Sequence, residues 1–481
     1  MNLRVITRNI GLALLVDALF MFVSAGVAAL YDFDSSFSPL LLSAFLTLVV
    51  AVLPLVFVGK GASRITTREG LVILFFAWFL SCVFGLLPYA LWGGPFSLEN
   101  AWFESVSGFT ATGATILADI ESLPHGLLFW RSATHFVGGL GVVVFMMMIL
   151  PSTGTVKLKM RHLEVSDISA GDYNFRSNKI VRVVLTVYLT LMVAATVLFI
   201  VAGLPVFDAV AHAFSAVATG GFSTRNASIG AYGSRWVELI AMVFMLISSL
   251  HYGLIYSSVT GRNLNLLRNP VVKFFLASLG ICIVLIFAGL MISGTYTNPL
   301  EALWQAAFNA VSLGSSTGMA TVDTSVWPSF CILILIYLSI QCGCSGSTTG
   351  GLKADRMWLM FKAVKAQVVR TIHPNAVIRV KAGKSVADTD QVNAVGAYTL
   401  LYLMIMFLGA VLYAGCGMNL EDSFTASCAL VGNVGPAFGT VGSLENYAAV
   451  PVLAKVLMGL EMIIGRLGLY AVFSVFAMRK K

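Results

Sequence analysis

Four short segments of the chain carry residue types that could bind a cation stripped of its water. Each ends in glycine, after residues that are small or carry a hydroxyl or amide group: Thr110, Ala111, Thr112 and Gly113; Ala218, Thr219, Gly220 and Gly221; Ser315, Ser316, Thr317 and Gly318; Gly432, Asn433, Val434 and Gly435. Glycine adopts positive φ without a steric penalty. Such a segment can therefore direct several backbone carbonyls at one point, as a filter for a dehydrated cation must. A single segment of this kind would more simply be a turn.

The segments repeat along the chain. Aligned on Gly113, Gly221, Gly318 and Gly435, they recur roughly every hundred residues, and a repeat of that length normally marks a structural unit. Four copies of one loop in one chain predict four similar units arranged about a common axis.

The composition places these units in a membrane. Hydrophobic residues make up 58% of the 481 residues and charged residues only 11%, whereas about 25% of the residues in a soluble domain are charged. Apolar runs of about twenty residues, the length of a membrane-spanning helix, recur along the chain. The sequence therefore predicts an all-α integral membrane protein. Four helix–pore loop–helix repeats would surround one pore in pseudo-fourfold symmetry, after an N-terminal two-helix hairpin.

The elements that must position the four segments divide the chain into five parts. We expect the two-helix hairpin over residues 1–65 and pore repeats over residues 66–160, 161–265, 266–385 and 386–481. In each repeat one helix spans outward, a shorter helix returns partway, the segment follows as extended chain, and a second helix spans inward. Residues 237–259 and 449–477 are expected as single spans, whereas the second helix of the third repeat is broken and a cytosolic segment follows it. This gives about ten spans with both termini cytosolic.

The distribution of charge supports this topology. Lysine and arginine gather in the predicted inner loops, as is typical of cytosolic loops, and acidic residues gather outside and avoid the middle of the spans. Acidic residues also lie near the start of the short helices: Glu99, Glu104, Asp208, Glu301, Glu421 and Asp422. They would cap these helices and could also concentrate cations at a pore mouth. The net charge of +8 therefore indicates anionic lipid and a cytosolic partner, and not nucleic acid.

Two further features lie within apolar runs. A stretch containing Gly343, Gly346, Gly350 and Gly351 should break its helix, because glycine costs up to about 1 kcal/mol per residue there. It fits either a plain interhelical loop or a functional loop inside the membrane. Arg466 lies in the last apolar run, where a charge costs about 2.5–3.5 kcal/mol. It is therefore a functional candidate, with an arginine that snorkels or pairs with carbonyls as the alternative.

Nothing in the sequence is typical of an enzyme. Cys342 and Cys344 lack a second pair of metal ligands. His135, His212 and His251 lie near helix ends and are interpreted as packed groups. There is no glycine-rich nucleotide loop and no pair of catalytic acids. We therefore expect no catalytic residue, no cofactor in this chain, and no metal except a transported monovalent cation at the four segments.

The four segments resemble the pore loops of the Trk/Ktr/HKT superfamily of potassium uptake proteins, and of its TrkH-type members in particular. The resemblance covers essentially the whole chain and is carried by residues 104–115, 138–142, 218–224 and 432–436. It implies the four-unit fold around one pore. A glycine in each filter loop (Gly113, Gly221, Gly318 and Gly435) also implies transport of potassium in preference to sodium.

The resemblance implies roles for the two further features. Gly343, Gly346, Gly350 and Gly351 would belong to an intramembrane loop that acts as a gate, and Arg466 would be an electrostatic barrier below the filter. Related proteins usually continue Arg-Leu-Glu at this point. Gly468 replaces the glutamate here, which leaves open how the charge of Arg466 is compensated.

The resemblance also implies partners and a location. These are a homodimer in the bacterial inner membrane and a cytosolic TrkA-like subunit that binds nucleotide, for which the basic residues between 362 and 384 offer a docking surface. The expected function is potassium transport through a channel-like pore. The alternatives are a symporter that couples potassium to protons or sodium, and a membrane enzyme. Parallel repeats and the lack of mid-span acids argue against the symporter.

Overall fold

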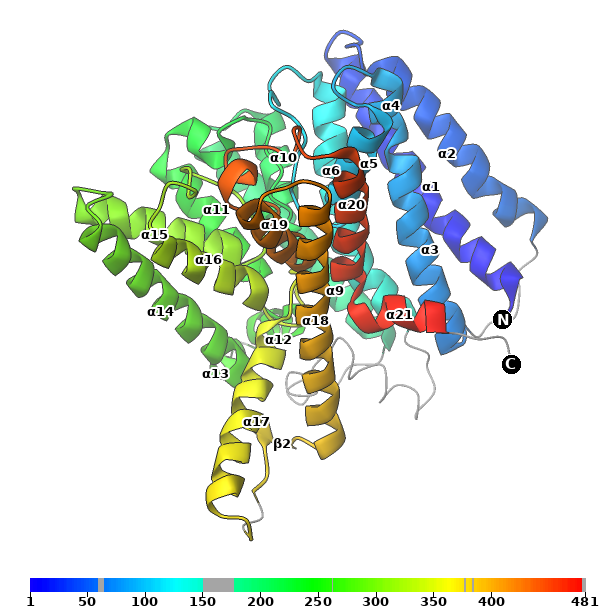
Figure 1. The fold of residues 1–481 in the computed structure, drawn as a ribbon. Coiled ribbons are helices and arrows are strands. Elements are labelled where there is room, and N and C mark those ends of the chain that lie inside the picture. The colour runs from blue at the N-terminus through cyan, green and yellow to red at the C-terminus, as the bar shows by residue number, and fades with distance from the viewer. Residues whose placement is uncertain (59–64, 150–176, 262, 376–377, 383–384, 478–481) are drawn as a thin grey trace.

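The computed structural model describes residues 1–58, 65–149, 177–261, 263–375, 378–382 and 385–477, and these are helical almost throughout (Figure 1). Six helical stretches in these ranges are long and apolar enough to cross a membrane: α1 (Leu3–Leu30), α2 (Phe37–Phe57), Arg68–Trp92, Val181–Val201, α14 (Pro270–Ile292) and α18 (Thr389–Gly415). Two bent helix pairs raise the number to eight. Helices α6 (His125–Ile149) and α16 (Ser329–Gln341) occupy the other two positions at which the sequence predicts a span.

The N-terminal helices α1 and α2 pack along each other, and α1 also packs against α3 (Thr67–Gly85) and α6. Asp17 is buried in the middle of α1 and accepts a hydrogen bond from Ser81 Oγ of α3, at 2.5 Å. Glu461 is likewise buried within α20. The prediction that acidic residues avoid the middle of the spans is therefore wrong. A hydroxyl from a neighbouring helix supplies the hydrogen bond that a buried carboxyl group requires.

Four short helices of 12 to 16 residues lie between pairs of longer ones: α5 (Leu98–Phe109), α10 (Val206–Val217), α15 (Pro299–Gly314) and α19 (Leu420–Gly432). None is long enough to cross a bilayer. Acidic residues occupy the first turn of all four, as predicted: Glu99, Asp208, Glu301, Glu421 and Asp422. Glu104 is the exception, because it lies in the middle of α5 and is fully buried.

Two predicted single spans are broken. Residues 237–259 form α11 (Arg235–Ser248) and α12 (Tyr252–Thr260), which meet at 100°, and residues 449–477 form α20 (Val452–Leu467) and α21 (Leu469–Ala477), which meet at 104°. The second bend lies at Gly468, whose φ of +84° ends the helix. Each bend lies within a run that is long and apolar enough on average to pass as one span, so mean hydropathy gives no sign of it.

The third unit is interrupted where its glycine content predicts a break. Helix α16 ends at Gln341, residues 342–353 form a loop, and α17 (Ala354–Ile372) begins beyond it. Figure 1 shows α17 and the start of α18 projecting from the body of the molecule. Between them β1 (Lys381–Ala382) and β2 (Ser385–Val386) form a two-residue antiparallel ladder, which is a small correction to the all-α prediction.

The remaining helical elements are short connections. They are α4 (Leu87–Trp92), η1 (Ser228–Tyr232), α13 (Asn265–Arg268) and η2 (Gly439–Val441). The long helix α9 (Ser177–Val201) contains the span over Val181–Val201 and is the first long helix of the second unit. The five domain boundaries given above stay a prediction.

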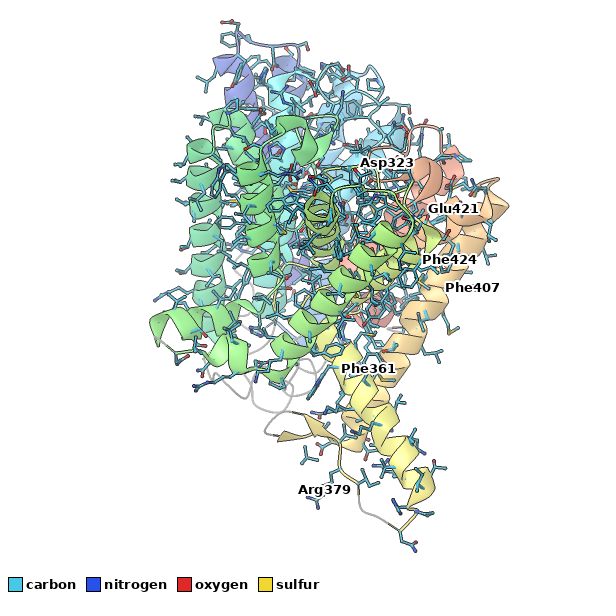
Figure 2. The ribbon with its side chains drawn as sticks, turned by 90° about the vertical axis from the view of Figure 1, so that its left-hand side faces the viewer. Asp323, Phe361, Arg379, Phe407, Glu421 and Phe424 are labelled. Carbon is cyan, nitrogen blue, oxygen red and sulfur yellow. The ribbon has the colours of Figure 1, made fainter. Side chains whose placement is uncertain are left out.

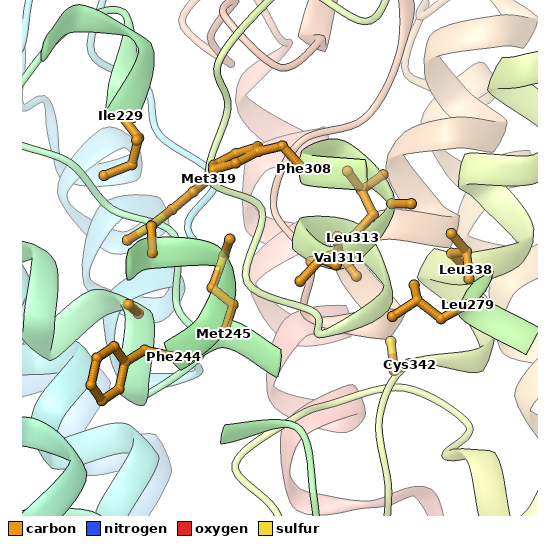
Figure 3. Close-up of a cluster of buried hydrophobic side chains, with 14 of the residues drawn as sticks. Ile229, Phe244, Met245, Leu279, Phe308, Val311, Leu313, Met319, Leu338 and Cys342 are labelled. Atoms are coloured by element: carbon orange, nitrogen blue, oxygen red, sulfur yellow. The ribbon is translucent and has the colours of Figure 1, made fainter. Parts of the chain in front are cut away.

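The core is centred on the short helices. Phe308, Val311 and Leu313 of α15 lie in one large buried cluster (Figure 3), and a second cluster joins α5, α19 and α20 to the N-terminal helices. Large apolar side chains are exposed on the outer faces of the long helices, among them Phe45 on α2 and Phe407 on α18. Phe407 is labelled in Figure 2. Such faces suit contact with lipid. The polar segments therefore lie inside and the apolar surface outside, as in a multi-pass membrane protein.

Candidate cation-binding site

The four predicted segments, here called loops 1 to 4, have the same backbone conformation. Each directly follows a short helix, and two residues in each loop have positive φ, a non-glycine residue and the glycine two positions later. The pairs are Ala111 (+48°) and Gly113 (+85°), Thr219 (+55°) and Gly221 (+87°), Ser316 (+53°) and Gly318 (+76°), Asn433 (+52°) and Gly435 (+87°). Positive φ is uncommon for residues with a Cβ, so its recurrence shows that the four loops share one structure.

The same hydrogen bonds hold each loop to its short helix. The backbone N–H of Thr112 donates to the Ser107 carbonyl at 2.9 Å. The equivalent bonds run from Gly220 to Ser215, from Thr317 to Ser312 and from Val434 to Ala429, at 2.8 to 2.9 Å. Because the N–H groups face back toward the helices, the chain is anchored through its donors and its carbonyls remain for another partner.

The loops stand side by side in a closed ring. A Cβ added at Gly113 would collide with the carbonyl oxygen of Gly220 in loop 2. In the same way, a Cβ at Gly221 would collide with the carbonyl oxygen of Thr317 in loop 3, and a Cβ at Gly318 with that of Val434 in loop 4. A Cβ at Gly435 would collide with the carbonyl oxygen of Thr112, which closes the ring at loop 1. All four glycines also line one cavity. The structure therefore brings together four segments that are separated by about a hundred residues each in the sequence.

The carbonyl groups of the ring are buried and unpaired. Within the described residues, no hydrogen bond reaches the carbonyl oxygens of Thr112, Gly220, Thr317 or Val434, although each residue is buried. Buried carbonyl groups nearly always have a partner. Four such oxygens around one cavity form an electronegative site that suits a dehydrated monovalent cation.

The side chains of the loops bond to one another. Thr110 and Thr112 share a hydroxyl hydrogen bond of 2.7 Å, and Ser315 and Thr317 share one of 2.8 Å. Asn433 Nδ2 donates to Thr112 Oγ1 at 3.0 Å, which ties loop 4 to loop 1. These bonds occupy the hydroxyl groups, so the backbone carbonyls are the better candidates for binding a cation.

Charges and dipoles around the ring favour a cation. The C-terminal ends of the four short helices lead into the loops, and a helix C-terminus carries partial negative charge. On the exposed segment after loop 1, a hydrogen bond of 2.9 Å from Asn226 lowers the pKa of Asp119 below its usual value. Asp119 therefore keeps its negative charge to lower pH near the mouth of the cavity.

The glycine-rich loop lies directly against loops 2, 3 and 4. The backbone N–H of Gly350 donates to Ser316 Oγ of loop 3 at 3.1 Å, and Thr219 Oγ1 of loop 2 donates to Thr348 Oγ1 at 3.3 Å. A Cβ at Gly350 would collide with the carbonyl oxygen of Gly432. The stretch is therefore a buried loop packed on the ring, and not a plain connection between two helices.

The structure also explains why the other three predicted positions of this loop are glycine. Gly346 and Gly351 have φ of +77° and +73°, and the position of a Cβ at Gly343 lies against the backbone of Ser249. The Ser249–His251 break between α11 and α12 therefore borders the loop. Cys344 N donates to the Ser249 carbonyl at 2.9 Å, which holds the two breaks together.

Arg466 binds the same loop. Its Nη1 donates to the Thr348 carbonyl at 2.6 Å and its Nη2 to the Gly138 carbonyl at 3.4 Å, and the residue is 5% exposed. Backbone carbonyls thus compensate the charge in a chain that has Gly468 where related proteins have glutamate. Carbonyl pairing was the alternative to a functional role for Arg466, and the contact with the loop is compatible with both, so the role as a barrier stays a prediction. The position of Arg466 beside the loop was not evident from the sequence.

The three histidines are packed, as predicted. His135 and His212 are fully buried and His251 almost so. The His135 ring stacks on Phe222 with centroids 4.2 Å apart, and it fills the space that a Cβ at Gly220 would need. No group of three or more His, Cys, Asp or Glu side chains that could hold a metal ion occurs among the described residues.

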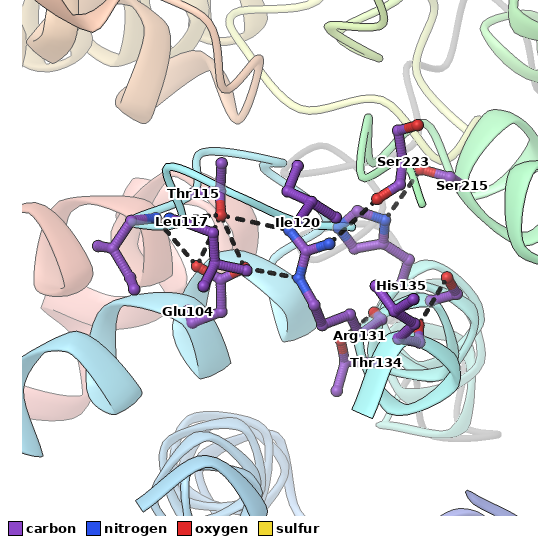
Figure 4. A network of polar contacts seen from close by, with 12 residues as sticks. Glu104, Thr115, Leu117, Ile120, Arg131, Thr134, His135, Ser215 and Ser223 are labelled. Carbon is purple, nitrogen blue, oxygen red and sulfur yellow. Dashed lines mark hydrogen bonds and ion pairs between the residues drawn. The ribbon is translucent and has the colours of Figure 1, made fainter. Parts of the chain in front are cut away.

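The sequence analysis missed a buried ion pair beside the ring. Arg131 of α6 binds Glu104 of α5 at 2.8 Å, with both side chains buried (Figure 4). Two features of the sequence could have predicted this ion pair. Arg131 is a basic residue in a predicted outer segment, and Glu104 lies too far along its helix to cap it. Only the tertiary structure shows that the two residues meet.

Apolar spans, short helices that enter partway, and a buried ring of unpaired carbonyls define a helical, multi-pass membrane protein built around a cation site. A family model described as TrkH, a cation transport protein, matches residues 43–480. The chain belongs to this family and is a transporter rather than an enzyme. The resemblance noted in the sequence is confirmed.

Individual relatives agree over the full length. The Trk system potassium uptake protein TrkH of Salmonella typhimurium is 31% identical over 99% of both chains. The Trk system potassium uptake protein TrkG of Escherichia coli K12 is 33% identical over 87% of this chain and 86% of its own. The crystal structure of the potassium transporter TrkH from Vibrio parahaemolyticus has a TM-score of 0.90 at 29% identity, covering 99% of this chain and 98% of that one.

Proposed function

We propose that this protein transports potassium through a channel-like pore whose selectivity filter is the ring of loops 1 to 4. The observation that carries the proposal is the closed ring itself, in which each loop glycine stands against a carbonyl of the next loop. The ring also supports the proposed pseudo-fourfold arrangement of four units around one pore. The names of the relatives supply the ion, since they are potassium uptake proteins.

Potassium also fits the chemistry of the ring. Carbonyl oxygens can replace the hydration shell of an ion that loses its water readily. All four loops have glycine at the position of closest approach, so all four can contribute backbone oxygens equally. The loops differ in their side chains, and we therefore expect weaker discrimination than in a filter made of four identical loops.

We propose that the loop over residues 342–353 is the gate and that Arg466 is part of it. Their support is the contact between Gly350 and Ser316 on one side and between Thr348 and Arg466 on the other. A buried positive charge beside a loop packed on the ring would oppose the passage of cations. Moving the loop would shift Arg466 as well, because the two are hydrogen-bonded.

The position of the buried acidic residues favours a channel-like mechanism over coupled symport. Glu461 accepts hydrogen bonds from Tyr413 and Ser427, and Asp17 accepts one from Ser81. Asp17 and Glu461 lie on helices outside loops 1 to 4, and Glu104, the buried acid beside the ring, is paired with Arg131. A proton-coupling acid would be expected at the ion site itself.

We propose the remaining features from the family resemblance. They are a bacterial inner-membrane location with cytosolic termini, a homodimer, and a cytosolic TrkA-like ring through which nucleotide regulates transport. The basic surface of α17 and its neighbourhood supports the cytosolic contact, and Arg379 lies exposed there (Figure 2). The chain itself would need no cofactor.

Flux into liposomes tests the proposal. Purified protein should carry rubidium or potassium down a concentration gradient, with less sodium, and an imposed proton gradient should change the rate only through the membrane potential. Empty liposomes are the control. Uptake that requires a proton or sodium gradient when the potential is clamped would establish the symporter instead, and absence of any cation flux would overturn both.

A further inference from the structure

Arg131 contacts the outer ends of two filter loops at once (Figure 4). Its Nε donates to Glu104 Oε1 at 2.8 Å, its Nη1 to the Ser223 carbonyl at 3.1 Å and its Nη2 to Thr115 Oγ1 at 3.3 Å. The guanidinium carbon lies 4.1 Å from the centre of the Phe222 ring. Each of the three guanidinium nitrogens therefore donates a hydrogen bond and one face of the group lies on an aromatic ring, while the residue is only 1% exposed.

Glu104 completes the connection from the other side. Both of its carboxylate oxygens lie 3.0 Å from Thr115 Oγ1, and its Oε2 also accepts a hydrogen bond from the backbone N–H of Ile116 at 3.1 Å. Thr115 follows Gly113 by two residues, and Ser223 follows Gly221 by two residues. The ion pair thus holds the chain at the same point after the glycine in loop 1 and in loop 2.

In loops 3 and 4 the comparable bonds lie three residues after the glycine, and they join neutral groups. Thr321 Oγ1 donates to Gln305 Oε1 at 2.5 Å, and the Phe438 backbone N–H donates to Thr425 Oγ1 at 3.3 Å. Among the ion pairs of the described residues, only that of Arg131 and Glu104 has both side chains fully buried. Bonds between charged groups are stronger than neutral ones, so one side of the ring is held more firmly than the other.

We propose that Arg131 is a positioning residue for ion selectivity, which rests on the proposed potassium filter. It touches no ion. It fixes the separation of loops 1 and 2, so that the ring cannot contract around the smaller sodium ion. A filter of four unequal loops lacks the mutual support of identical subunits, and this pair supplies a rigid side from within one chain.

The test replaces Arg131 by lysine. Lysine keeps the positive charge but has one compact ammonium group that cannot reach Glu104, Ser223 and Thr115 together. We expect the potassium-to-sodium flux ratio in liposomes to fall about tenfold, the effect of losing one charge-assisted hydrogen bond. Maximal potassium flux should fall much less, because the ring oxygens are unchanged. A role in folding alone would lower the fluxes of both ions equally.

The matched control is Arg235→Lys. Arg235 also binds carboxylates, including Glu238 at 2.9 Å, but it is 48% exposed and lies at the start of α11. Its variant should keep the wild-type flux ratio. Gel filtration and thermal unfolding in detergent establish that each variant is folded.

The outcomes separate the inference from the proposed function. A wild-type protein that shows no preference for potassium contradicts the function itself. A selective wild type with an unchanged ratio in folded Arg131→Lys overturns the inference. Should that variant fail to fold, Thr115→Val decides, because it removes one hydroxyl and leaves the ion pair in place. It should also lower the ratio, and a wild-type ratio would overturn the inference.

Discussion

Two requirements coincide at Gly435. Its φ of +87° disfavours any residue with a Cβ, and the space that a Cβ would occupy is taken by the Thr112 carbonyl oxygen. Gly113, Gly221 and Gly318 meet the same two requirements. Many other glycines of the chain meet one of them or neither. The glycine pattern in the sequence therefore reflects how closely the loops approach, in addition to how the chain turns.

Replacing Gly435 by alanine should abolish selective potassium flux. The methyl group would displace the Thr112 carbonyl from the ring, and liposome flux measures the loss. Gly417→Ala is the matched control, because Gly417 has φ of +98° with nothing within 4 Å of the added Cβ. Both variants place a Cβ at positive φ, which costs on the order of 1–2 kcal/mol, and the contact of the Cβ is the main difference between them. Equal flux from the two variants would contradict the filter.

Arg466 should affect transport differently, because it places a positive charge beside the proposed path of the ion. Arg466→Ala should raise potassium flux about fivefold, since a nearby unit charge costs a passing cation on the order of 1 kcal/mol even when well screened. Single-channel or liposome flux recordings measure the change. Arg4→Ala, at an exposed position near the N-terminus, should leave the flux unchanged. A lower flux in folded Arg466→Ala would show that the arginine supports the pore instead of obstructing it.

At the scale of elements, breaks in helices bring the functional groups together. The break at Ser249–His251, the loop over residues 342–353 and the bend at Gly468 interrupt three apolar helices. The first two lie in contact, and the third lies two residues after Arg466. Non-helical backbone at membrane depth is tolerated only where protein or a water-filled cavity surrounds it. The first break is buried against the loop over residues 342–353, the proposed gate, and Arg466 joins the last span to the same loop.

Shortening the gate loop tests this arrangement. Deleting residues 345–347 should raise potassium flux, because the remaining chain cannot reach both Ser316 of loop 3 and Arg466. Ser345→Ala is the control, since it removes only the hydroxyl bond to Asp355, of 2.8 Å, and keeps the loop length. Unchanged flux in a folded deletion variant would count against gating by this loop.

At the scale of the whole molecule, α17 is the exception to a compact body. It projects with an apolar stripe formed by Phe361, Val364, Val368 and Ile372, all more than half exposed. Their spacing of three or four residues places them on one helix face. Phe361 is labelled on this helix in Figure 2. A second copy of the chain would cover the stripe, in agreement with the proposed homodimer.

Substituting both Phe361 and Val368 by glutamate should shift the protein from dimer to monomer in detergent. Two carboxylates placed in an apolar contact cost several kcal/mol when buried without partners. Light scattering coupled to gel filtration measures the mass. Val326→Glu, at a position outside α17 that is 73% exposed, should leave the mass unchanged. A dimer that survives the double substitution would place the interface elsewhere.

The sequence was sufficient to locate most of the spans, the four short helices and the four loops that follow them. These depend on local properties: the length of apolar runs, the position of helix-starting acids, and a repeated pattern ending in glycine. The same local evidence misplaced Glu104, joined the helices that break at Ser249–His251 and Gly468, and missed the buried acids Asp17 and Glu461.

The tertiary structure alone decided which loops are neighbours, what compensates Arg466 and which residues support the ring. Each answer is a contact between distant parts of the chain, as between Gly435 and Thr112 or between Arg466 and Thr348. The hydropathy of a segment depends only on its own residues, so it does not indicate which segment packs against it. The identity of the opposite segment follows only from the packing of all the helices together.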